Sequence, residues 1–88
     1  MNRSEILETI AEYLELDSAE FEHFDPLNDS NQAFKLAIDF ELDVCLTLHG
    51  TKVSLDGKLL SECYGKDVYV AAREAIALSV YKLIRELK

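Results

Sequence analysis

The 88-residue sequence contains no tryptophan, one proline and three glycines, so little in it interrupts regular secondary structure. No apolar run approaches the roughly 20 residues that a membrane-spanning helix needs. The N-terminal residues lack the basic-then-apolar pattern of a signal peptide. The two cysteines predict buried thiols rather than a disulfide. Together these features predict a cytoplasmic protein.

Positive charge is missing from the first third of the chain. No lysine or arginine occurs between Ser4 and Phe34, whereas that stretch holds nine acids. From Lys35 onward eight acids balance eight bases, and Arg3 offsets one acid, so the first third carries the whole net charge of -8. This distribution argues against direct binding to nucleic acid or to an anionic membrane, and it predicts a partner protein with a basic surface.

The periodicity of the first residues predicts an amphipathic helix from about Arg3 to Leu16. Its inward residues are Ile6, Leu7, Ile10, Ala11, Tyr13 and Leu14. The opposite side carries an acidic ridge of Glu5, Glu8, Glu12 and Glu15. Two interpretations of the ridge stay open: a solvated face that keeps the protein soluble, or a docking surface whose carboxylates mimic a row of phosphates.

An irregular connection is expected from Asp17 to Ser30, where Phe21 and Phe24 either cover the core or form a contact site. The residues Asp25 to Asp29 predict a fixed turn, because proline sets φ and Asn and Asp side chains bond to nearby backbone. Asp29 or Ser30 then caps a short helix that ends near Phe40. The inward residues expected on that helix are Ala33, Phe34, Ala37, Ile38 and Phe40.

Three short strands are predicted next, over 43–49, 52–55 and 58–64. Gly50-Thr51 and Asp56-Gly57 are the expected turns, and the second pair suits a two-residue type I′ hairpin. That register places residue 48 opposite 53, 46 opposite 55, and 53 opposite 60. With the last helix, one core is predicted from Val44, Leu46, Leu48, Val53, Leu55, Leu60, Ile76, Val80 and Leu83.

The last helix is expected to begin after an Asp67 cap and to run for some 20 residues. Its main apolar stripe comprises Tyr69, Ala72, Ile76, Ala77, Val80, Leu83, Ile84 and Leu87. A second stripe comprises Val70, Ala71, Leu78 and Tyr81. Helices with a second apolar side commonly bury it in another subunit, so these four residues form a possible homodimer face. The alternative is that an N-terminal helix covers them within one chain.

We therefore expect residues 1–88 to form a single domain of the α/β (α+β) class. The expected order is two N-terminal helices, a three-stranded antiparallel meander, and a long C-terminal helix packed on the sheet.

The segment from Phe24 to Phe34 resembles the opening of small phage and prophage proteins that share a phage "ABA sandwich" domain. Those proteins have an aromatic residue, Asp-Pro, an Asn or Asp cap and a short helix. They end in an alanine-rich helix similar to residues 67–78 here. The resemblance implies a fold and a phage-type origin in a bacterial host, and it implies no catalytic residues.

Catalytic and metal-binding signatures are weak. Cys45, His49 and Cys63 share strand parity in the predicted meander, but their spacing matches no zinc signature. The two cysteines would lie about 9–10 Å apart across the middle strand, too far for a disulfide. No nucleophile elbow and no glycine-rich phosphate loop is present. We expect no cofactor, no metal and no enzymatic activity.

The function predicted from the sequence is that of a small acidic accessory protein that binds another protein. The alternative is an acidic inhibitor that mimics nucleic acid and blocks a host nucleic-acid-binding or defence protein. A small enzyme is the remaining hypothesis.

Overall fold

A computed structural model describes residues 3–65 and 67–87. It confirms the predicted α+β class: helices come first, then an antiparallel three-stranded sheet, then a long C-terminal helix. The elements are α1 (Arg3–Tyr13), α2 (Ser18–Glu22), α3 (Ser30–Asp39), β1 (Asp43–Thr47), β2 (Gly50–Leu55), β3 (Lys58–Tyr64) and α4 (Val68–Leu87). No helix in the described ranges combines the length and apolar character needed to cross a bilayer.

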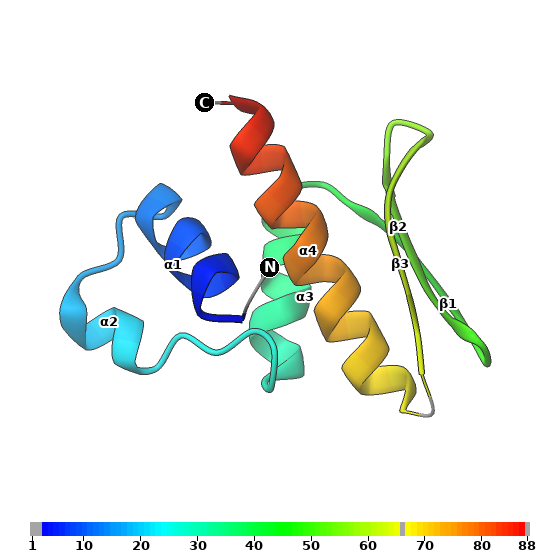
Figure 1. Cartoon of the computed structure of the whole chain (residues 1–88), viewed down its shortest axis with the longest axis horizontal. Coiled ribbons are helices and arrows are strands. Elements are labelled where there is room, and N and C mark those ends of the chain that lie inside the picture. The colour runs from blue at the N-terminus through cyan, green and yellow to red at the C-terminus, as the bar shows by residue number, and fades with distance from the viewer. Residues whose placement is uncertain (1–2, 66, 88) are drawn as a thin grey trace.

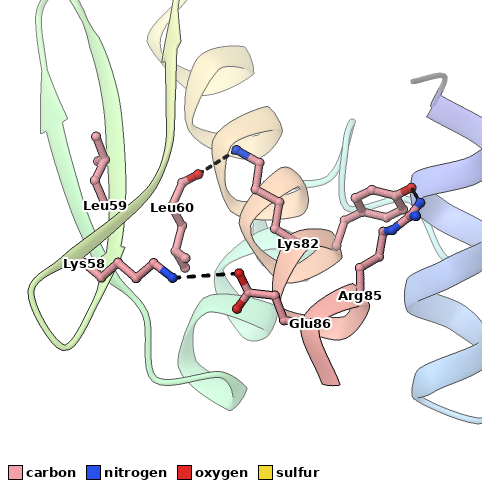
Figure 2. Close-up of a pocket in the computed structure, with 7 residues that line it drawn as sticks. Lys58, Leu59, Leu60, Lys82, Arg85 and Glu86 are labelled. Atoms are coloured by element: carbon pink, nitrogen blue, oxygen red, sulfur yellow. Dashed lines mark hydrogen bonds and ion pairs between the residues drawn. The ribbon is translucent and has the colours of Figure 1, made fainter. Parts of the chain in front are cut away.

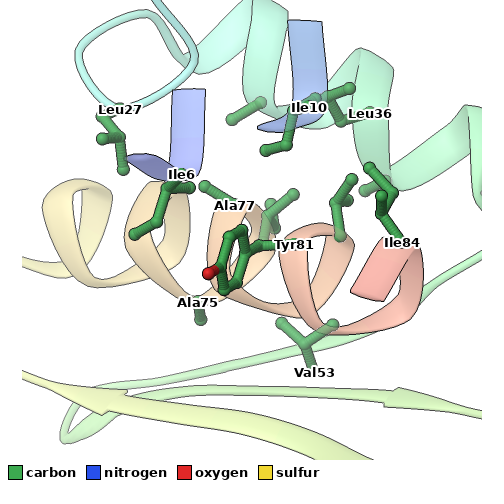
Figure 3. Packing of buried hydrophobic residues seen from close by; sticks show 13 residues of the cluster. Ile6, Ile10, Leu27, Leu36, Val53, Ala75, Ala77, Tyr81 and Ile84 are labelled. Carbon is green, nitrogen blue, oxygen red and sulfur yellow. The ribbon is translucent and has the colours of Figure 1, made fainter. Parts of the chain in front are cut away.

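Helix α4 lies at the centre of the molecule. The sheet packs on one side of it, whereas α1 and α3 contact it from elsewhere around its circumference (Figure 1). Figure 3 shows Val53 pointing from the sheet toward α4, while Ile10 and Leu36 approach from the helical side. Five small residues let these neighbours come close, and they are Ala71, Ala72, Ala75, Ala77 and Ser79.

The second apolar stripe of α4 is covered within the same chain. Ala71 and Tyr81 are buried, and Val70 and Leu78 are half-buried. Helix α1 contacts α4, and the Tyr81 hydroxyl donates a hydrogen bond of 2.9 Å to the Glu5 carboxylate. The alternative of intrachain cover therefore describes this stripe, and the argument for a dimer through these four residues no longer holds.

Helices α1 and α3 end in the same way. Glu15 and Glu41 adopt left-handed backbone with φ of 56° and 55°. The following amides, of Leu16 and Leu42, bond back to the carbonyls of Ala11 and Ala37 at 3.1 and 2.8 Å. This is the Schellman arrangement, which stops a helix and turns the next apolar residue toward the body of the protein. The first helix therefore ends at Tyr13, before the predicted Leu16, because Glu15 leaves helical geometry.

The connection between α1 and α3 is more regular than predicted, because it contains α2. Asp17 accepts a hydrogen bond from the Glu20 amide at 2.8 Å, and Glu20 accepts one from the Asp17 amide at 3.1 Å. This reciprocal pair is a capping box, which fixes the start of a helix. The expectation of an irregular segment is therefore wrong for Ser18–Glu22.

The turn from Asp25 to Asp29 is held from two sides. The Gln32 side chain accepts from the Asp25 amide at 2.7 Å and donates to the His23 carbonyl at 2.8 Å. Arg73 of α4 donates to the Leu27 carbonyl and to the Ser30 hydroxyl, each at 2.9 Å. Asp29, rather than Ser30, caps α3. The fixed turn predicted here is confirmed, and Arg73 ties it to the central helix.

The β1–β2 register differs from the prediction by four residues. Val44 pairs with Val53, and Thr47 pairs with Gly50, so the turn falls at Leu48-His49. The Thr47 hydroxyl accepts from the amides of His49 and Gly50 at 3.2 and 3.1 Å, which stabilises the turn there. Gly50 belongs to the strand, where a Cβ atom would lie 2.5 Å from the Cys63 carbonyl oxygen.

The β2–β3 hairpin confirms the predicted Asp56-Gly57 turn, whose two residues both have positive φ. Farther from the turn, however, a β-bulge changes the pairing. Ser54 pairs with Leu59 but Val53 pairs with Ser61, so Leu60 is an extra residue on β3. The predicted pairing of 53 with 60 is therefore wrong by one residue.

These shifts revise the predicted core. Val53, Leu60, Ile76 and Val80 are buried, whereas Leu46 and Leu48 are 52% and 89% exposed. Leu46 lies on the edge strand β1, opposite the buried Thr51 of β2, and Leu48 lies in the turn that follows β1. Val44 and the residues Leu55 and Leu83 are partly buried.

The helical stripes also need correction at their ends. Phe34, Ile38, Tyr69 and Leu87 are exposed, and Leu36, which the prediction omitted, is buried. Tyr13 is half-exposed and lies against Phe40, with ring centroids 5.8 Å apart.

The revised core makes a direct prediction about stability. Ile76 is fully buried, so Ile76→Ala should lower the free energy of unfolding by about 2–5 kcal/mol. In the monomeric chain, at low protein concentration, Leu46→Ala should lower it by less than about 0.5 kcal/mol, since half of Leu46 is exposed there. Urea unfolding of both variants provides the measurement. Equal losses would show that β1 packs on α4 more fully than described.

Gly50 provides a second prediction. Gly50→Ala should destabilise the fold by more than about 1 kcal/mol, because the new Cβ would clash with backbone of β3. Gly65→Ala is the matched control, since a Cβ there meets nothing within 4 Å. Thermal unfolding followed by circular dichroism measures both. A harmless Gly50→Ala would contradict the close approach of β2 to β3.

Candidate functional site

The acidic N-terminal segment keeps its negative charge uncompensated in the folded protein. Its eight acids from Glu8 to Asp29 form no ion pair with any residue that the structure describes. The ion pairs that do form join Arg3 to Glu74, Lys35 to Asp39, Lys58 to Glu86 and Arg85 to Glu5. These carboxylates therefore produce a negative electrostatic potential that extends into the solvent around them.

The predicted acidic ridge is shorter in the structure. Glu5 lies 3.6 Å from Arg85 and accepts the hydrogen bond from Tyr81, so it serves the α1–α4 contact. Glu15 lies outside the helix, in left-handed backbone. Glu8 and Glu12 remain as exposed neighbours one helical turn apart.

Two clefts open beside these carboxylates, and Leu16 lines both of them. The smaller cleft, of about 220 Å³, is lined by Glu8, Ala11, Glu12, Leu16 and Phe21. The larger cleft, of about 340 Å³, is lined by Leu14, Leu16, Glu20, Phe24, Gln32, Lys35, Leu36 and Asp39. We call the two clefts together the acidic face.

Three local structural features hold the residues of the acidic face in place. The Schellman end of α1 turns Leu16 toward both clefts. The capping box of α2 fixes Glu20 at the rim of the larger cleft. The hydrogen bonds of Gln32 hold the segment that carries Phe24. The result is an apolar floor beside which lie several carboxylates and one lysine, Lys35, which is paired with Asp39.

Phe21 and Phe24 take different roles. Phe24 packs against the core cluster and lines the larger cleft. Phe21 is 39% exposed and lines the smaller cleft. Phe24 therefore covers the core, as one of the two interpretations expected, whereas a contact role for Phe21 stays a prediction.

A third cleft, of about 390 Å³, is lined by three basic side chains. Lys58, Lys82 and Arg85 line it together with Glu86 (Figure 2). Each cation already has a partner: Lys58 lies 3.8 Å from Glu86, Lys82 donates to the Leu60 carbonyl at 2.7 Å, and Arg85 donates to the Tyr81 hydroxyl at 2.7 Å. Figure 2 shows Arg85 pointing away from the two lysines. Their charges do not converge on one point, as an anion site would require.

The histidine and cysteine positions differ from the prediction. The bulge at Leu60 puts Cys63 opposite Thr51, on the side of the sheet that faces α4, whereas Cys45 pairs with Lys52 on the outer side. Cys45, His49 and Cys63 therefore do not share a face. Both cysteines are free, and Cys45 is exposed rather than buried. No cluster of three metal-ligating side chains occurs among the residues described.

The four residues of the predicted dimer face do not form a site together, since two of them belong to the core. Sequence reasoning missed the clefts of the acidic face. The pattern Asp17-x-x-Glu20 signals the capping box and so the position of Glu20. Nothing local signals that Leu16 and Phe21 meet beside Glu12, because this depends on tertiary packing.

The comparisons with known proteins give no further identification. No protein-family model, no curated protein and no solved structure matches the chain. The resemblance to phage sandwich proteins therefore stays a prediction.

The two thiols should differ in reactivity. Burial raises the pKa of the Cys63 thiol above its usual value, and the Glu74 carboxylate raises it further while Lys82 lowers it. Less thiolate is then present at pH 8, and access is reduced as well. Iodoacetamide should therefore alkylate Cys45 before Cys63, as peptide mass spectrometry can show. Faster labelling of Cys63 would contradict its position beneath α4.

Proposed function

We propose that this chain is a non-enzymatic accessory protein that binds a basic partner protein through the acidic face. The observation that carries the proposal is the uncompensated charge of the acids from Glu8 to Asp29 beside two clefts with apolar floors. Carboxylates steer a basic partner during encounter, whereas apolar contacts supply affinity once it is bound. A phage-type origin and a location in the bacterial cytoplasm belong to the same proposal.

The chemistry of the partner follows from the clefts. The larger cleft suits a single large apolar side chain, since Leu14, Phe24 and Leu36 line it. Glu8 and Glu12 are about one helical turn apart, so they suit two lysines or arginines at similar spacing on the partner. A segment with one large apolar residue and neighbouring bases would meet both requirements.

An inhibitor that mimics nucleic acid is the second candidate. The same uncompensated carboxylates favour it, because proteins that bind nucleic acid present clustered lysine and arginine side chains. In that case the partner would be a host nucleic-acid-binding or defence protein, and an oligonucleotide would compete with this chain for it.

The groups with raised pKa values give little support to an enzyme. They are Cys63, Tyr64 and Arg85, whose pKa values rise chiefly through burial, a hydrogen bond to Glu62, and a hydrogen bond to Tyr81, respectively. They belong to different surroundings, and of the three only Arg85 lines a described cleft.

The acidic face predicts a specific effect of charge removal. Glu8→Gln with Glu12→Gln should abolish capture of the partner, while the stability of the fold is kept or slightly raised by relief of like-charge repulsion. Glu62→Gln with Glu86→Gln is the matched control, since it removes the same charge from exposed residues of β3 and α4. Affinity capture from a bacterial lysate, with each variant immobilised, provides the measurement.

The supporting result is a basic protein that the wild type and the control variant retain and that the Glu8/Glu12 variant loses. Its retention should fall steeply as salt is raised, because exposed charges are screened. Elution by a duplex oligonucleotide would favour the inhibitor. Equal capture by both double variants would indicate that the acidic face keeps the protein soluble and does not bind the partner.

A further inference from the structure

The sheet has two edges, at β1 and β3, and only one of them is protected. Strand β3 carries a bulge at Leu60 and the charged residues Lys58 and Glu62. In addition, the Lys82 ammonium group donates a hydrogen bond to the Leu60 carbonyl oxygen. Bulges, charges and covering side chains are the usual means of preventing edge-to-edge pairing. Among the residues that the structure describes, strand β1 has none of these over Val44–Thr47.

The free edge of β1 can be assigned residue by residue. A two-residue turn is closed by a hydrogen-bonded pair, which here is Thr47 and Gly50. Hydrogen-bonded pairs alternate along an antiparallel ladder, so Asp43, Cys45 and Thr47 bond to β2. The backbone groups of Val44 and Leu46 therefore point away from β2, to the open edge.

The side chains at this edge are apolar and incompletely covered. Val44 is partly buried and Leu46 is 52% exposed. From Val44 to His49 the chain contains no lysine, arginine, aspartate or glutamate. An uncharged edge strand with exposed apolar side chains is a template for pairing with another strand.

The geometry points to a second copy of this chain as the partner, and we propose a two-fold dimer formed by antiparallel pairing of β1 with β1. The inference is independent of the acidic face. The two sheets would join into one six-stranded sheet, made of three strands from each copy. Two-fold pairing of identical patches is the commonest closed arrangement of subunits.

One register satisfies all the free groups. If the two-fold axis passes beside Cys45, Val44 of each copy lies opposite Leu46 of the other, and both outward residues form their hydrogen bonds. Shifting by one pair in either direction places Leu42 or Leu48, which lie outside the strand, opposite an edge residue. In the favoured register Val44 and Leu46 also pack side by side, which covers apolar surface that the single chain leaves exposed.

Charge permits this contact. The stretch from Asp43 to Tyr64 contains three acidic and two basic residues, which gives it a net charge of -1. The acidic helices α1 and α2 lie on the other side of α4 from the sheet (Figure 1). The register also places Asp43 opposite Thr47, so that no two acids face each other across the junction.

The favoured register puts the two exposed Cys45 residues directly opposite each other as a non-hydrogen-bonded pair. Their Cα atoms would be about 4.5 Å apart, within the range of about 4.4–6.8 Å that a disulfide accepts. Diamide, a two-electron oxidant, would accept the two thiol hydrogens as the sulfur–sulfur bond forms. Cys63 faces α4 from β3 and cannot reach its counterpart across this junction.

Sedimentation equilibrium at tens of micromolar should give the mass of a dimer. Leu46→Lys should raise the dissociation constant by about tenfold or more, because a lysine at the edge prevents strand pairing. Leu59→Lys is the matched control, since Leu59 is 49% exposed on β3 and lies away from the β1 edge. Circular dichroism checks that both variants fold.

Cross-linking tests the register, and the covalent dimer of the wild type does not depend on the folding of any variant. Diamide should give a covalent dimer with the wild type and with Cys63→Ser, but not with Cys45→Ser. A monomeric mass throughout would overturn the proposal, as would a dimer that Leu46→Lys leaves intact. A dimer in which Cys45 fails to cross-link would overturn the register.

Discussion

The fold depends on the close approach of all its layers to α4. A helix usually buries one stripe, but α4 is buried around most of its circumference in its middle turns, where the sheet, α1 and α3 each contact it. Small side chains make this possible, since an alanine lets a neighbouring backbone approach where a leucine would hold it away. The large side chains of the core, among them Ile10, Val53 and Ile84, fill the spaces between these contacts. The sheet, α1 and α3 are therefore positioned relative to α4, and two of these helices, α1 and α3, line the acidic face.

Much of the architecture could be predicted from local patterns. The Asp56-Gly57 turn, the Asp67 cap and the Asp25–Asp29 turn each depend on a few adjacent residues, and each is found where it was expected. The charge distribution also indicated which end of the chain would be acidic. These predictions succeeded because the physics that determines them acts within one turn of helix or one hairpin.

The errors came from interactions between residues distant in sequence or from two local signals in competition. Gly50 resembles a turn residue, but it is required because β3 lies against it, whereas the Thr47 hydroxyl sets the turn. The bulge at Leu60 reversed the side of the sheet on which Cys63 lies. The apolar floor of the acidic face depends on how α1, α2 and α3 pack together, which no periodicity reveals.

The position of α4 in the chain has a consequence for synthesis on the ribosome. Every other described element precedes α4, so the sheet, α1 and α3 emerge from the exit tunnel before the helix on which they pack. The hairpins and capped helices can form early, because their contacts are local. Their apolar surfaces nevertheless stay open to solvent and to chaperones until α4 has emerged from the tunnel. Completion of the fold is thus a late, cooperative step that joins both layers at once.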